Sequence, residues 1–456
     1  MQGYEMEGMI LLKKMMFVML TIILLLTACS GNGGGETKGE TKGETKDGQK
    51  TVVLSVMRQD RFLENAVRKF EEKNPNIRIE LKEYKASENT GEGGMSMEAL
   101  SLADVEKYVQ SVTTQVISGK GADLILMSEL PQDKFVAKKL LVNLNDLIAK
   151  DSSFDQKTLY TNILKASEDG DGLYAMPFSF SLNLFQGNTE LLKQANIAVD
   201  KKEAWNWSQF KEVAQQLKQQ GGAEKLINLA PITLLFDYIE DNYEQLVGAG
   251  KPNFDSDLFR NMLNEIKSMY EEGLLNEGMS FDDGLAAFQM VEVYSPEQAI
   301  AMSEGLEYYQ RPSASGDKNG TAFKPAYSLG INSKSEVQAE AWAFIAFLLS
   351  EDMQSSPNLT GIPINKSATE NRFKEMVQKI ENGTLETMMP MPDGETAKKR
   401  VEEVTRLISE VDIRRFSDMK VLMIAMEEFN SYMSGQKSAE EVSKLIQNRV
   451  NTYLNE

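Results

Sequence analysis

The chain contains no histidine and a single cysteine among its 456 residues. The absence of histidine excludes Ser-His-Asp triads, histidine general bases and histidine metal ligands. One cysteine cannot form a disulfide within the chain or supply the thiolates of a zinc or iron–sulfur site. The sequence also lacks the phosphate-binding pattern Gly-x-x-x-x-Gly-Lys-Ser/Thr, and no Gly-x-Gly-x-x-Gly follows a predicted strand. We therefore expect neither an ATPase nor a bound cofactor.

Basic residues are outnumbered by acidic ones. Lys plus Arg is 49 and Asp plus Glu is 68, which gives a formal net charge of −19. Contacts with phosphates require cations, so we expect no nucleic-acid partner. Hydrophobic residues make up 41% of the chain, an ordinary value for a soluble protein, and the length indicates two or three domains.

Residues 1–28 are predicted to be a secretion signal, although Met9 is a possible alternative start. Lys13 and Lys14 precede an apolar run that ends by Ala28 and is too short to span a bilayer core of about 30 Å. The tetrapeptide 26–29, Leu-Thr-Ala-Cys, resembles the lipobox of bacterial lipoproteins. Cys29 would then carry the lipid, and a free structural thiol is the alternative. This predicts a protein anchored to the extracytoplasmic face of the cell membrane.

Residues 29–50 are predicted to be a flexible tether that begins with the lipidated cysteine. After Cys29 the segment contains no apolar residue, and it repeats Gly-Glu-Thr-Lys three times. Such a segment cannot bury a core. Its typical end-to-end distance is about 25 Å.

The rest of the chain begins as a mixed α/β pattern. Apolar, β-branched or alternating runs predict strands at 51–57, 77–81 and 123–127. Apolar residues at helical spacing predict helices around 62–70 and 99–118. The order β-α-β-α-β indicates a parallel sheet with helices on its faces.

The second half is predicted to be rich in helix. Capping-box patterns that begin at Ser295, Ser335 and Ser438 mark helix N-termini, and Pro296 stands at a favourable first helical position. From residue 368 onward almost the whole sequence has a helical pattern. Trp205 and Trp342 lie in helical contexts and are predicted to be core residues.

Eight segments resemble, in order, the extracellular solute-binding proteins of family 1, the sugar-type binding lipoproteins of ABC importers. They are residues 52–76, 119–128, 172–178, 191–210, 281–288, 328–349, 361–363 and 435–451. The resemblance covers 26–456 apart from the tether. Each segment alone is weak evidence, and their order behind a lipobox makes the resemblance specific.

This resemblance implies an α/β, periplasmic-binding-protein-like fold of type II, with two α/β lobes joined by a hinge and a helix-rich C-terminal half. By analogy, the N-terminal lobe takes 51–177 plus 325–356 and the C-terminal lobe takes 178–324 plus 357–456. The solute would lie between the lobes, and in open α/β sheets ligands do bind beyond the carboxyl ends of strands.

Candidate binding residues follow from the strand ends and from the two crossings between the lobes, which the resemblance places at 172–178 and 323–327. They are Arg58, Asp60, Ser128, Glu129, Phe178, Phe180, Tyr294 and Tyr327. The set offers flat aromatic faces for sugar C–H surfaces and charged or hydroxyl groups for sugar hydroxyls. A scaffold role is the alternative for each of them. Arg58 stands near a position where the family often has tryptophan, and we hypothesise that it favours an acidic saccharide such as a uronate oligomer.

The sequence therefore predicts a monomeric, lipid-anchored binding protein without enzymatic activity. It would capture a small polar solute, with an oligosaccharide as the first choice, and deliver it to the transmembrane permease subunits of an ABC importer. Three alternatives remain open: a ligand-binding component that feeds a signalling kinase, a binder of peptides or other polar solutes, and a surface glycan hydrolase.

Overall fold

The computed structural model describes residues 48–85, 102–201, 203–220, 225–227, 229–248, 251–275, 286–301, 305–313, 321–415 and 418–455. The predicted signal peptide, Cys29, nearly all of the tether and the resemblance at Phe281 and Gly284 lie outside these residues. Residues 45–456 form one compact unit, to which everything below refers.

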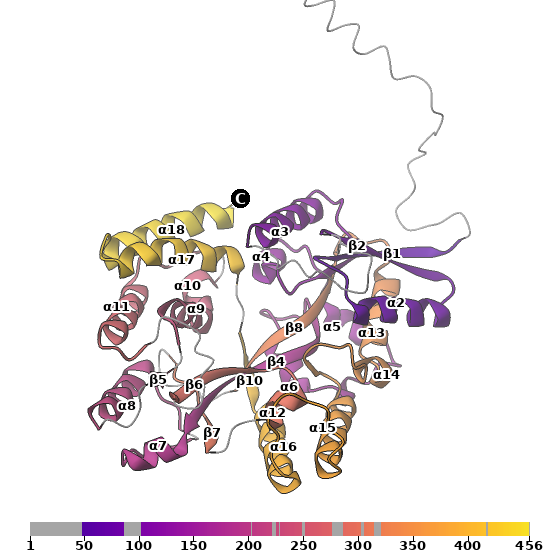
Figure 1. Cartoon of the computed structure of the whole chain (residues 1–456). Helices are drawn as coiled ribbons and strands as arrows, with labels where there is room; N and C mark the ends of the chain where they lie inside the picture. The colour runs from indigo at the N-terminus through magenta and orange to yellow at the C-terminus, as the bar shows by residue number, and fades with distance from the viewer. Residues whose placement is uncertain are drawn as a thin grey trace, which may run out of the picture. The chain divides into compact units, whose positions relative to one another are not determined.

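The described strands form one mixed sheet. They are β1 (Lys50–Val56), β2 (Ile77–Glu83), β3 (Leu124–Leu126), β4 (Met176–Asn188), β5 (Lys225–Ile227), β6 (Ala286–Val293), β7 (Leu306–Tyr309), β8 (Thr321–Ile331), β9 (Ile362–Pro363) and β10 (Val411–Arg414). Their order is β2-β1-β3-β8-β4-β6-β5, with β10 beside β8 and with β7 and β9 beside β4 (Figure 1). β1 runs parallel to β2 and β3, so the predicted β-α-β-α-β start and the mixed α/β class are confirmed.

The long strands β4 and β8 link the two ends of this sheet. Their antiparallel pairing joins Met176 to Leu329 at one end and Asn183 to Ala322 at the other. The C-terminal end of β8 pairs with β3, whereas its N-terminal end pairs with β10. The second half of β4 pairs with β6 and β7. Both segments predicted to cross between lobes, 172–178 and 323–327, lie in or beside these two strands.

The middle of the β4–β8 pair is irregular. The register shifts on both sides of Ser179, opposite Pro325 and Tyr327. Pro325 has no backbone N–H to donate, which favours an interrupted ladder at this point. Gly361 has a φ of +94°, and a Cβ on it would lie 3.0 Å from Ser179 Cβ and 3.1 Å from Ala326 Cβ. Only glycine fits this place against both strands.

We expect Gly361→Ala to lower the free energy of unfolding by at least about 2 kcal/mol, because it adds backbone strain and a steric overlap. Urea unfolding measures the change. Gly383→Ala is the control, since Gly383 has a φ of +64° with no atom within 4 Å of the added Cβ. If both substitutions cost the same, the close approach of Gly361 to the strands has no energetic consequence.

The first large hydrophobic cluster surrounds β1, β3 and the first half of β4. Its helices are α2 (Arg61–Lys73), α5 (Leu144–Ile148), α6 (Thr161–Ala166), α12 (Pro296–Ile300), α13 (Gln338–Leu348), α14 (Glu351–Gln354), α15 (Lys366–Glu381) and α16 (Gly394–Ser409). The 3-10 helix η1 (Gln156–Thr158) precedes α6. Trp342 is buried in this cluster, as predicted.

The second large cluster surrounds β5, β6 and the end of β4. Its helices are α7 (Thr189–Gln194), α8 (Trp207–Gln219), α9 (Pro231–Asp241), α10 (Tyr243–Val247), α11 (Asp257–Glu271), α17 (Met419–Met433) and α18 (Ala439–Asn455). Trp205 is buried here, again as predicted. A third, small cluster packs α3 (Leu102–Ile117) and α4 (Gln132–Ala137) against the other side of β3.

These clusters divide the chain differently from the predicted lobe boundaries. The prediction assigned all of 357–456 to the C-terminal lobe, but Leu359, Phe373, Val404 and Val411 belong to the first cluster. The reason is that α15 and α16 pack on each other and on α12. Only α17 and α18 join the second cluster. The lobe boundaries themselves stay a prediction.

Local signals placed most helix starts correctly. Ser295 caps α12, and Ser438 and Glu441 form reciprocal hydrogen bonds at the start of α18. The prediction at Ser335 was wrong, because α13 begins at Gln338 and Ser335 Oγ instead donates to Asp123 Oδ1 at 2.7 Å. Within the described ranges, none of the helices combines the length and apolarity that crossing a membrane requires.

Candidate functional site

Asp60, Phe178 and Tyr327, three of the candidate binding residues, lie together in the structure. Asp60 Oδ1 caps α2 by accepting from the Leu63 N–H at 2.8 Å, and its other oxygen accepts from the Tyr327 hydroxyl. The Tyr327 ring stacks on Phe178 with centroids 5.3 Å apart, and Phe178 stacks in turn on Phe62 at 5.9 Å. Burial, together with the Asp60 charge, raises the pKa of Tyr327 well above its ordinary value. These contacts tie the start of α2 to the crossing strands.

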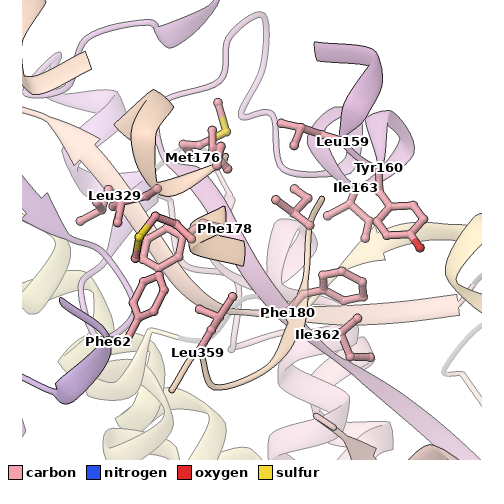
Figure 2. Close-up of a cluster of buried hydrophobic side chains, with 14 of the residues drawn as sticks. Phe62, Leu159, Tyr160, Ile163, Met176, Phe178, Phe180, Leu329, Leu359 and Ile362 are labelled. Carbon is pink, nitrogen blue, oxygen red and sulfur yellow. The ribbon is translucent and has the colours of Figure 1, made fainter. Parts of the chain in front are cut away.

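Phe178 and Phe180 differ from the expectation of aromatic faces open to a solute. They are 1% and 0% exposed. Figure 2 shows Phe62 beside Phe178 and Ile362 beside Phe180. Phe180 meets Tyr160 and Phe323 edge to face. The physical reason is that β4 is buried on both of its faces, so the alternation between core and surface that the prediction assumed is lost. In this arrangement both residues pack the core beneath the crossing.

The other candidates are dispersed. Ser128 donates to the Ala326 carbonyl at 3.1 Å, and Glu129 beside it is exposed. Tyr294 follows β6 and is 46% exposed. Arg58 is half-buried just past β1. Of these four, only Ser128 and Glu129 line the cavities described next.

Three cavities follow the line where α3, α4 and the loop after β3 meet α10, α17, α18 and the end of β10. We call this line the seam. Cavity A has a volume of about 290 Å³ and is lined by Asp133, Lys134, Ala137, Lys138, Asp169, Glu240, Asp241, Tyr243, Glu244, Gly248, Ile413, Arg414 and Leu454. Cavity B, of about 300 Å³, lies between α3 and α17 and shares Lys134 with cavity A. Cavity C, of about 30 Å³, is lined by Met127, Ser128, Gln132, Lys324, Pro325, Ser328, Arg414 and Arg415.

Polar contacts join the two sides of the seam. The Tyr243 hydroxyl donates to Asp133 Oδ2 at 3.3 Å. Lys134 Nζ donates to the Tyr453 carbonyl at 3.1 Å and lies 4.5 Å from the centroid of the Tyr453 ring. Two ion pairs, Lys420 with Glu106 and Arg414 with Asp169, add to these contacts. The seam is therefore held by charge and hydrogen bonds, which can separate and re-form in water more readily than an apolar core.

A buried ionic cluster supports the seam from the α9 side. Arg415 has a 5% exposed side chain, with Nη2 2.6 Å from Asp237 Oδ1 and 2.7 Å from Glu240 Oε2. Arg311 Nη1 lies 2.9 Å from Asp241 Oδ1. Burial lowers the pKa of Arg415, but the three acids outweigh it and raise that pKa above its usual value. Sequence analysis missed this cluster, because 178 residues separate Asp237 from Arg415 and no local motif connects them.

We expect Arg415→Met to lower the free energy of unfolding by about 3–5 kcal/mol, because it leaves the Asp237 and Glu240 carboxylates buried without their cation. Denaturant unfolding measures the loss. The control, Arg260→Met, removes partly exposed pairs with Asp255 and Asp257 and should cost no more than about 1 kcal/mol. Equal costs would contradict the assigned role of Arg415.

The environment of the seam disfavours the ionised form of two further carboxylates, Asp418 and Asp133. Asp418 is 3% exposed and caps α17 by accepting from the Lys420 N–H at 2.9 Å. Burial, and secondly the nearby Asp133 charge, raise the pKa of Asp418 to about 6 against the opposing effect of its hydrogen bond from the Tyr453 hydroxyl. Burial also raises the pKa of Asp133, against its hydrogen bond from Tyr243.

This predicts a pH-dependent stability. The folded-state pKa of Asp418 is higher than its unfolded value, so its stabilising contribution is complete below about pH 4 and is lost as the pH rises through about 6. At about 1.4 kcal/mol per pKa unit, Asp418→Asn should be more stable than the wild type at pH 7.5 by roughly 2–3 kcal/mol, with the difference vanishing near pH 4. Asparagine keeps the helix cap. Unfolding curves of both proteins between pH 4 and 7.5 test this, and a constant difference would refute it.

The sequence matches the model of the bacterial extracellular solute-binding protein family over residues 55–355. The match covers more than half of the chain, which therefore belongs to this family and is a solute-binding protein, not an enzyme. The predicted family and the absence of enzymatic activity are confirmed, and the hydrolase alternative is excluded. No curated protein matches the chain by sequence.

Solved structures of solute-binding proteins have the same fold as this chain. An ABC substrate-binding protein from Listeria monocytogenes, in complex with cycloalternan, has a TM-score of 0.55 at 15% identity over 89% of this chain and 98% of its own. A family 1 extracellular solute-binding protein from Alicyclobacillus acidocaldarius gives 0.56 at 17% identity over 90% and 99%. The sugar-binding protein MalE from Xanthomonas citri gives 0.57 at 14% identity over 89% and 97%. The periplasmic-binding-protein-like fold is thereby confirmed.

Proposed function

We propose that the protein captures a carbohydrate, most readily an oligosaccharide, at the seam and delivers it to the transmembrane subunits of an ABC importer. Family membership supports solute capture, and the Listeria protein of similar fold, in complex with cycloalternan, supports a sugar as the solute. Binding would draw the two sides of the seam together, since a ligand shifts a conformational equilibrium by its differential affinity for the two states.

The observation that carries this proposal is the chemistry of cavities A, B and C. Small-molecule pockets in proteins typically measure about 300–1,000 Å³. The cavities at the seam approach this size and meet along shared residues, Lys134 between A and B and Arg414 between A and C. Carboxylates, guanidinium groups and hydroxyls face them, which are the groups that hydrogen-bond sugar hydroxyls. Tyr243 and Tyr453 add aromatic surface for sugar C–H groups.

The proposal assigns different roles to the binding residues that were predicted from the sequence. Ser128 and Glu129 remain candidates for solute contact. Asp60, Phe178, Phe180 and Tyr327 would support the hinge through their mutual packing and the hydrogen bond at Asp60. Arg58 and Tyr294 remain predictions for the rim of the site.

We further propose that Cys29 is lipidated and that the protein acts as a monomer on the extracytoplasmic face of the membrane. The Leu-Thr-Ala-Cys tetrapeptide and the apolar-free segment that follows it support this. A tether of this length would hold the binding unit near a permease while leaving it free to reorient.

The direct test is a thermal-shift and calorimetric panel of neutral oligosaccharides, uronate oligomers, amines and peptides against the purified protein. A true ligand at 100 times its Kd should stabilise the fold by about 2.7 kcal/mol. We expect saccharides to bind and to be recovered unchanged. Stabilisation by peptides alone, or by no saccharide, would contradict the proposal.

A further inference from the structure

Three residues on interior strands share one face of the sheet. Ser181 on β4 lies directly opposite Lys324 on β8, and the Ser181 hydroxyl donates to Glu292 Oε1 on β6 at 2.5 Å. Opposed residues of antiparallel strands point to the same face, so Ser181 lies between the other two side chains. Ser181 is 2% exposed, whereas Glu292 and Lys324 are exposed. We call these three residues the floor.

The floor is an uncovered part of a sheet face that is covered on both sides of it. Four residues after Ser181 on the same strand, Phe185 is buried in the second hydrophobic cluster. Toward β10, Arg415 is buried by its pairs with α9, and it lines cavity C together with Lys324. β8, β4 and β6 are interior strands, so solvent reaches them here through this face and not from an edge of the sheet. The floor therefore opens onto the seam at cavity C.

The floor presents one carboxylate and one ammonium group. Among the residues that the structure describes, neither Glu292 nor Lys324 forms an ion pair. Lys324 does act on Glu240 at a distance: burial raises the pKa of Glu240, and the charges of Arg415 and Lys324 oppose this rise. Glu240 is already paired with Arg415, with 2.7 Å between Oε2 and Nη2. Both exposed charges of the floor are thus placed to contact a solute.

The spacing of the two charges leaves room for a sugar ring. β4 separates β6 from β8, so the backbones that carry Glu292 and Lys324 lie two strand spacings apart, about 10 Å. The residue between them, Ser181, has a small side chain and leaves the space above β4 to the solute. Tyr294 follows Glu292 by two residues, is 46% exposed and adds aromatic surface beside the floor.

We propose that a neutral ring of the solute lies across Ser181, with its hydroxyls hydrogen-bonded to Glu292 and Lys324. This inference rests on the proposed function and narrows its solute to neutral saccharides. A carboxylate accepts from a sugar hydroxyl, and an ammonium group donates to one. A charged group on that ring would be attracted by one of the two side chains and repelled by the other, so the cost of removing its water would not be offset.

The same argument opposes an acidic saccharide. The uronate hypothesis from the sequence depends on Arg58, which lines none of the three cavities. At the floor, a uronate carboxylate near Lys324 would also lie near Glu292. The floor therefore selects against the solute charge that was hypothesised from the sequence.

Matched triplets of ligands test the inference by calorimetry at pH 7.5. The probes are maltotriose, cellotriose and mannotriose, each in three forms: unmodified, with every C6 alcohol oxidised to a carboxylate, and with every C6 hydroxyl replaced by an amine. We expect at least one unmodified trisaccharide to bind, and to bind at least about tenfold more tightly than both of its charged twins.

Two substitutions assign this preference to the floor. Glu292→Gln should weaken the neutral ligand about tenfold and reduce its preference over the carboxylate twin to less than about threefold. Lys324→Met should do the same for the amine twin. Each substitution thus relaxes the exclusion of one charge, which a merely structural role would not produce. The controls Glu80→Gln and Lys379→Met change exposed residues outside the floor and should preserve both preferences.

The outcomes also distinguish this inference from the proposed function. A charged twin that binds as tightly as its neutral form would overturn the inference and leave carbohydrate capture intact. A preference that survives both floor substitutions would place the selecting groups elsewhere and overturn the inference as well. Binding of amino acids or peptides without any saccharide would contradict the proposed function, and the inference would fall with it.

Discussion

The pairing of β4 with β8 is the constraint on which the rest of the structure depends. Together these two strands connect the two halves of the sheet, because β8 pairs with β3 and β10, whereas β4 pairs with β6 and β7. Their ladder breaks around Ser179, where Gly361 fits closely against both strands. Backbone hydrogen bonds between β4 and β8 thus connect the two halves of the sheet. The irregular middle of the pair is the place where the strands can bend with the smallest loss of hydrogen bonds.

The interior and the seam are built from different interactions. The three hydrophobic clusters stabilise their own helices and strands, and the contacts across the seam are ionic or hydrogen-bonded. Buried ion pairs contribute little net stability compared with apolar packing but are sensitive to the loss of one partner. A seam of this kind is suited to a protein that opens in water and closes over a polar solute. Water can hydrogen-bond its polar groups in the open state, and the solute and the opposite side of the seam can do so in the closed state.

The sequence predicted those features that local patterns encode. The strands that became β1, β2 and β3, the caps at Ser295 and Ser438, and the burial of Trp205 and Trp342 all follow from spacing or capping within a few residues. The site was predicted less well. Phe178 and Phe180 were expected to present their ring faces to a solute. This expectation failed because β4 is buried on both faces, a feature that has no local signature in the sequence. Arg415 reaches Asp237, and Asp418 comes near Asp133, only through tertiary folding, so no local motif could reveal these residues.

The central claim is that the two sides of the seam move apart and close over a solute. Cys29 is the only cysteine of the chain, so spin labels can be placed at Lys107→Cys on α3 and Asn451→Cys on α18 in a Cys29→Ser background, both at exposed positions. Pulsed electron paramagnetic resonance then gives the distance between the labels. The account predicts a broad or long distribution without solute and a single shorter one at saturation. One unchanged distance under both conditions would contradict it.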